Sequence, residues 1–176
     1  MAVWNVIDHN EFSGSANSYE KTSIPASYDH LYFVASARSD ASGAYVDFCN
    51  FEFNGDTTAS NYSSVFFQAF TGTPASSSGA YSWAAQIPGP SAVANSFGCC
   101  EIWIPNYANS SNHKPVSARS AGPNNSGTDN HFNIGVGATL WKNTAAINAF
   151  KFLVHGGSDN MVQYSTFTLY GINGAG

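Results

Sequence analysis

The feature that most limits what this chain can fold into is an alternation of side chains with a period of two. In Met161–Ile172, one face is expected to carry Val162, Ser165, Phe167 and Leu169. The opposite face carries a stripe of aromatic and hydroxyl side chains, namely Tyr164, Thr166, Thr168 and Tyr170. Successive side chains of a β-strand point to opposite faces of a sheet, so this segment is predicted to be a half-buried strand. Apolar residues at helical spacing are nearly absent, which argues against a helical fold.

Segments of this kind recur along the whole chain, separated by turn residues. We predict strands at Val3–Asp8, Ser18–Ile24, His30–Ser39, Tyr45–Asn54, Tyr62–Phe70, Ala80–Ile87, Phe97–Ile104, Pro115–Ala121, His131–Trp141, Ile147–Val154 and Met161–Tyr170. About ten to eleven short strands at this spacing predict an all-β, antiparallel β-sandwich with jelly-roll topology. Small-residue loops are expected at Thr71–Gly79 and Pro88–Ser96, and a short helix or a wide turn at Asn143–Ala149.

The composition favours one domain with a neutral surface. The chain has 176 residues, of which 15% are aromatic and only 10% are charged, where an average chain carries about 25% charged residues. No linker or internal repeat divides the sequence, so a single sandwich is expected over residues 12–176. A surface rich in hydroxyl and amide groups suits a protein that packs against neighbours or is displayed on a particle.

Charge and hydropathy patterns exclude several classes of partner. The net charge is −5, and the six basic residues are scattered rather than gathered in a stripe. Nucleic-acid binding is therefore not expected, because nothing would neutralise a phosphate backbone. No apolar run approaches the roughly 18 residues that a membrane-spanning helix needs. The first residues also lack the basic and apolar regions of a secretory signal.

The three cysteines are expected to be unpaired. Cys99 and Cys100 are adjacent in a strand pattern and face opposite sides, while Cys49 shares a face with Phe51. We interpret buried cysteines in this chain as small apolar residues, without a disulfide or metal role. Synthesis and folding in a reducing cytoplasm follow from this interpretation.

No catalytic, cofactor or metal site is predicted. The five histidines show no metal-ligand spacing, and no Gly-x-Ser-x-Gly motif is present. A pair of carboxylates from separate strands, as in a glycosidase, stays open. Asp56, Asp129 and Asp159 lie in Asn- and Gly-rich loops where calcium is conceivable, but turn formation is the stronger explanation.

The four tryptophans have two interpretations. Exposed indoles stack on sugar rings in carbohydrate-binding modules. Trp103 and Trp141, however, end strands dominated by apolar residues, where core or subunit-interface packing is more usual. Sugar binding is kept as the alternative.

Several segments together resemble small structural proteins of tailed bacteriophages, particularly those of aquatic bacteria. The resemblance covers most of Tyr19–Ile172 and preserves the segment order; its segments are Ser23–Leu31, Ala35–Ser39, Phe53–Ser64, Glu101–Ala108, Leu140–Ile147 and Tyr164–Ile172. It implies a non-enzymatic, β-rich virion protein that is made in the host cytoplasm. It also implies a homo-oligomer, expected to be a trimer because such proteins meet a symmetric shell.

Two roles in the virion are compatible with this resemblance. A capsid decoration or cement protein would bind the major capsid protein on the outer surface of the head and stabilise the shell. A tail-fibre or receptor-binding module would present loops to a host glycan. The chain is short, begins with Met and lacks a fibre-like repeat. These features favour decoration.

Two sets of residues are predicted to contact a neighbouring subunit. Residues 1–11 precede the region of resemblance and are expected to form an arm or an added strand, anchored by Trp4, Val6 and Ile7. The second set is the stripe Tyr164, Thr166, Thr168 and Tyr170, which is too polar for a core and too aromatic for idle solvent exposure.

Overall fold

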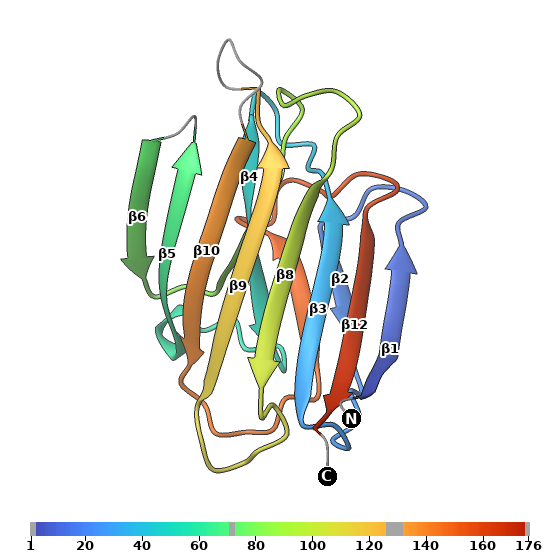
Figure 1. Ribbon diagram of the computed structural model, residues 1–176, viewed down its shortest axis with the longest axis vertical. Helices are drawn as coiled ribbons and strands as arrows, with labels where there is room; N and C mark the ends of the chain where they lie inside the picture. Colours follow the sequence, from blue (N-terminus) through green and yellow to red (C-terminus); the bar gives the residue numbers. More distant parts are fainter. Residues whose placement is uncertain (1–2, 71–72, 126–131, 175–176) are drawn as a thin grey trace.

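The computed structural model describes residues 3–70, 73–125 and 132–174 and consists of two packed antiparallel sheets (Figure 1). The larger sheet has the spatial order β1 (Val3–Glu11), β12 (Thr166–Asn173), β3 (His30–Ala37), β8 (Gly98–Pro105), β9 (Lys114–Pro123), β10 (Phe132–Trp141), β5 (Tyr62–Phe70) and β6 (Thr73–Gly79). The smaller sheet has the order β2 (Ser18–Lys21), β11 (Phe150–Val154), β4 (Val46–Phe53) and β7 (Trp83–Pro88). One 3-10 turn, η1 (Ala59–Asn61), precedes β5. Among the described residues, no helix has the length and apolarity to cross a membrane.

The connections between strands define a jelly roll. The chain passes from one sheet to the other at every step except β5–β6 and the run β8–β9–β10. Strands β2, β11, β4 and β7 thus cover the central strands of the larger sheet, while β1 and β6 form its two edges (Figure 1). The predicted all-β sandwich is confirmed.

Aromatic side chains fill the space between the sheets. Phe33 on β3 is fully buried, and its ring lies within 4.8–6.3 Å of the rings of Tyr19, Phe150, Phe152 and Phe167. Each fully buried Phe contributes about 1.5–3 kcal/mol relative to an exposed one. These rings come from both sheets, so they hold the two layers together.

The expectation of a loop at Thr71–Gly79 is wrong for residues 73–79, which form β6. This strand pairs with β5 at the edge of the larger sheet, and Pro74 to Ser78 are exposed. A strand with no layer packed over it needs no buried face, so its sequence shows no alternation. The predicted Thr71 lies outside the described residues.

The last strand begins later than predicted. Tyr164 has a φ of 70°, in the left-handed region, and β12 starts two residues after it and continues to Asn173. Met161 instead forms isolated bridges with Ala16 and Ser39. No helix forms at Asn143–Ala149. His131, predicted as the start of a strand, lies outside the described residues, and β10 begins at Phe132.

Strand β10 presents its small and polar residues to the core. The alternate residues Asn133, Gly135, Gly137, Thr139 and Trp141 are turned inward, where those with side chains are buried. A Cβ added at Gly137 would lie 2.4 Å from Cε3 of Trp83, and one at Gly135 would lie 2.9 Å from its Cζ2. The indole of Trp83 therefore packs directly on the backbone of β10, and only glycine fits beneath it.

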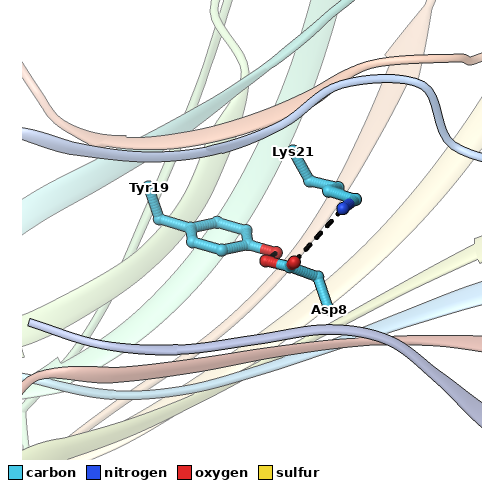
Figure 2. A network of polar contacts seen from close by, with 3 residues as sticks. All are labelled: Asp8, Tyr19 and Lys21. Atoms are coloured by element: carbon cyan, nitrogen blue, oxygen red, sulfur yellow. Dashed lines mark hydrogen bonds and ion pairs between the residues drawn. The ribbon is translucent and has the colours of Figure 1, made fainter.

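Residues 1–11 were expected to form an arm or an added strand. Within them, Val3–Glu11 forms β1, a strand added to the edge of the larger sheet of the same chain. Strand β1 pairs with β12, and a bulge between Val6 and Asp8 turns Asp8 toward the smaller sheet. The Asp8 carboxylate accepts a hydrogen bond of 2.9 Å from the Tyr19 hydroxyl and forms a 3.2 Å ion pair with Nζ of Lys21 (Figure 2). This network ties β1 to β2, and hence one sheet to the other.

Candidate functional site

The outer face of the larger sheet is the candidate functional site. The strand register aligns its outward side chains in rows across all eight strands. One such row is Val6, Tyr170, Tyr32, Trp103, Ser117, Ala138, Val65 and Ser78. The neighbouring row contains Val34, Glu101, Arg119, Val136 and Phe67. These rows place Tyr and Trp side chains at one end of the face and Val and Phe side chains toward the other.

An apolar stripe covers the β5–β10 end of this face. It consists of Val65, Phe67, Phe132, Ile134, Val136 and Leu140, which are 36–64% exposed. Val136 lies directly opposite Phe67 in the register. Together these side chains expose on the order of 500 Å² of apolar surface, near the upper end of what a monomeric protein usually shows. The apolar stripe exists because β10 turns its small and polar residues inward.

An aromatic cluster covers the β1–β12–β3–β8 end. The Trp4 ring lies 5.2 Å from that of Tyr32 and 5.9 Å from that of Tyr170, both at edge-to-face angles. The Tyr32 ring lies 6.2 Å from Trp103, which in turn lies 5.0 Å from His30. Such contacts add about 0.5–1.5 kcal/mol per pair beyond area burial. The aromatic cluster therefore fixes the positions of its rings while leaving Trp4 half exposed.

A polar network separates the aromatic cluster from the apolar stripe. The Glu101 carboxylate accepts hydrogen bonds from the Tyr32 hydroxyl and, at 2.7 Å, from Nε of Arg119. The bond from Tyr32, with help from Arg119, holds the pKa of Glu101 below its usual value. Because the small side chain of Ser117 lies next to Trp103, a shallow hollow of about 320 Å³ opens here. Glu101 and Arg119 are the two charged residues that line this hollow, and they form an ion pair with each other.

The structure brings most of the predicted contact residues onto this face. Trp4 and Val6 are more than half exposed, and Thr166, Thr168 and Tyr170 point outward from β12. Ile7 points inward, on the opposite face from Val6, and packs partly against the core. Tyr164 is exposed but lies before β12, and its backbone N–H donates to the Phe12 carbonyl. Contact of these residues with a second subunit stays a prediction.

Sequence reasoning missed the apolar stripe and the Tyr32–Glu101–Arg119 network. The alternation in β10 was the available signal for the stripe, since its apolar positions 132, 134, 136, 138 and 140 form one face. The network offered no such signal, because its members come from β3, β8 and β9 and meet only through the register.

The remaining candidates from the sequence are the histidines and the acidic loop residues that were considered as metal ligands. Among the residues that the structure describes, no three His, Cys, Asp or Glu side chains gather as a metal site. The Asp56 carboxylate accepts hydrogen bonds from Trp141 Nε1, Asn61 Nδ2 and the Thr58 amide, so it closes a turn as expected. Asp129 lies outside the described residues.

The cysteines follow the sequence prediction. All three are free; Cys49 and Cys100 are buried, and Cys99 points outward. Burial raises the pKa of both inner thiols. They therefore behave as small apolar core residues.

The fold and this face define a class: an all-β sandwich that presents a large, nearly uncharged aromatic and apolar surface. The chain matches no known family model, no curated protein and no solved structure.

Proposed function

We propose that this chain is a non-enzymatic structural protein of a tailed-bacteriophage particle, which self-associates through the apolar stripe and decorates the outer surface of the head. The observation that carries the proposal is the apolar stripe on β5 and β10. An exposed, contiguous apolar patch of this size marks an interaction site in a soluble protein. The resemblance to phage structural proteins supplies the setting.

A second copy of the chain is the partner that suits the apolar stripe best. None of the six stripe residues is charged, and Arg119, which lies opposite Val136, already forms an ion pair with Glu101. A charged partner would gain nothing here, whereas an identical uncharged face gains apolar burial. Stable interfaces bury about 800 Å² per partner, so the stripe with its margins approaches the required area. Most homo-oligomers have closed symmetry, and we propose a trimer in which the stripes of three copies meet around a three-fold axis.

The aromatic cluster is proposed as a further contact within the particle. Trp4, Val6 and Tyr170 lie on the same outer face as the apolar stripe but at its far edge. They are free to contact the major capsid protein or a neighbouring subunit while the stripe is covered. Aromatic residues are enriched at such interfaces.

Self-association is tested by light scattering coupled to size-exclusion chromatography. The variant Phe67→Glu/Ile134→Glu places two charges in the apolar stripe and is expected to be monomeric where the wild type is trimeric. Tyr45→Glu is the matched control, because Tyr45 is similarly exposed but precedes β4 of the smaller sheet. A wild type that is monomeric at tens of micromolar refutes the proposed assembly.

Location on the particle is tested by immunogold labelling of virions that carry the chain. Label over the whole head supports decoration. Label confined to the tail tip rejects it in favour of the receptor-binding role.

A further inference from the structure

A groove on the other side of the molecule has the composition of a ligand site. It has a volume of about 310 Å³ and is lined by Phe48, Asn50, Phe66, Tyr81, Trp83 and His155. Small-molecule sites range from about 300 to 1,000 Å³, so this groove suits a compact ligand. It lies apart from the apolar stripe, because Phe66 points inward from β5 of the larger sheet and Trp83 points inward from β7 of the smaller sheet.

The groove arises from the unequal widths of the two sheets. Strand β7, the edge of the smaller sheet, packs over β8, β9 and β10, while the β5–β6 hairpin extends past it. In Figure 1 this hairpin forms the left-hand edge of the molecule. The inward side of β5 therefore meets β4 and the β6–β7 connection across an open groove.

Aromatic rings form the floor and part of the walls. Phe66 stacks on Trp83 with ring centroids 5.1 Å apart and an interplanar angle of 7°. The rings of Phe48 and Tyr81 lie 6.1 Å and 6.2 Å from Phe66, both edge to face. These contacts hold the four rings in place before any ligand arrives, so binding loses little side-chain entropy.

Polar groups with hydrogen-bonding capacity accompany these rings. Nδ2 of Asn50 lies 3.2 Å from Nδ1 of His155, and the described residues provide no hydrogen-bond partner for Oδ1 of Asn50 or Nε2 of His155. The Trp83 indole N–H is buried beneath the groove and has no hydrogen-bond partner among the described residues. An adjoining hollow of about 330 Å³ shares Asn50, Tyr81 and His155 and adds Glu52 and Ser82. The Glu52 carboxylate forms a 3.5 Å ion pair with Lys151, so its charge is balanced.

We propose that this groove binds a neutral pyranose ring of a glycan. A sugar combines an apolar C–H face, which packs on aromatic rings, with hydroxyl groups that both donate to and accept from amide and imidazole groups. The groove offers both kinds of contact side by side. Its two joined hollows provide room for a second ring. An anionic ligand finds no guanidinium or ammonium group among the lining residues. This site does not depend on the proposed assembly, and a decoration protein that displays it would attach particles to surface glycans.

The test uses an array of neutral oligosaccharides of glucose, galactose, mannose and N-acetylglucosamine, followed by calorimetric titration with the best ligand. His155→Ala and Asn50→Ala are each expected to weaken binding at least tenfold without lowering the melting temperature. His113→Ala is the matched control, because His113 is an exposed loop histidine far along the chain from this groove. No binding to any neutral glycan, or equal binding by wild type and both groove variants, overturns the proposal.

The stripe variant Phe67→Glu/Ile134→Glu separates this site from the proposed function. It is expected to bind glycan with unchanged affinity although it no longer self-associates. Loss of glycan binding in this correctly folded monomer would overturn the assignment of the site to the groove.

Discussion

Replacing Gly137 with alanine tests the orientation of β10, on which the apolar stripe depends. The added Cβ would lie 2.4 Å from Cε3 and 2.7 Å from Cζ3 of Trp83. Phe66 stacks on that ring with the centroids 5.1 Å apart, so a shift of the indole disturbs this stacking. Overpacking of this kind costs about 1–3 kcal/mol. The lower entropy of the unfolded alanine chain offsets about 0.4–1 kcal/mol of it.

We expect a net loss of about 1.3 kcal/mol from the free energy of unfolding, measured by urea denaturation at one protein concentration. With a slope near 2 kcal/mol/M, the midpoint falls by about 0.6 M. Gly14→Ala is the control, because a Cβ at Gly14 meets no atom within 4 Å. It should leave the midpoint unchanged or raise it slightly.

A second substitution at Trp83 makes the test specific. In a Trp83→Leu background the indole is gone, so Gly137→Ala should cost at least 1 kcal/mol less than in the wild type. If Gly137→Ala leaves the wild-type midpoint within about 0.25 M, corresponding to about 0.5 kcal/mol, Trp83 does not pack on β10. The reasoning that turns the apolar residues of β10 outward would then be refuted.

Three further predictions concern single groups. Asp56→Ala should lower the unfolding free energy by about 2–4 kcal/mol in urea denaturation, because it leaves the buried Trp141 N–H without an acceptor and removes other bonds to a carboxylate. The folded-state pKa of Glu101 is lowered by its bond from Tyr32, so its stabilising effect is present above the unfolded pKa and is lost as the pH falls through the folded pKa. Stability of the wild type should therefore fall more steeply below about pH 4.5 than that of Glu101→Gln. A thiol reagent should modify one cysteine rapidly in the native protein and three in urea, and Cys99→Ser should abolish the rapid reaction. The same pH dependence of stability in the wild type and in Glu101→Gln would contradict the second prediction. Rapid reaction of all three thiols in the native protein would contradict the third.

The strands and the sandwich could be predicted because alternation is a local property. In β3, Leu31, Phe33, Ala35 and Ala37 share one face in the sequence, and all four are buried. In β10 the same reasoning points the wrong way, since its apolar face is exposed. The reason is Trp83, a residue more than 45 positions earlier in the chain, which needs the backbone at Gly135 and Gly137 to pack against. Tertiary packing of this kind leaves no local trace.

The candidate site was predictable only in part, for the same physical reason. The aromatic positions of β1 and β12 stand out within their own segments, and the structure places Trp4 beside Tyr170. Tyr32 and Trp103 join them because β12 pairs with β3, and β3 pairs with β8. Pairing order between strands distant in sequence is set by the whole fold. The groove around Phe66 likewise depends on how β4, β7 and the β6–β7 connection pack against the inward side of β5, which brings Phe48, Tyr81 and Trp83 around Phe66.

Because β12 lies between β1 and β3, this part of the larger sheet can form only after β12 has been synthesised. Strand β1 is synthesised before the other described strands, yet its partner spans Thr166–Asn173. Its backbone donors and acceptors therefore have no strand partner until β12 has been synthesised. Pairings between segments this distant close slowly and late. We therefore expect the nascent chain to remain open along one sheet edge, and the link from Asp8 to Tyr19 to form on a scaffold that is otherwise complete.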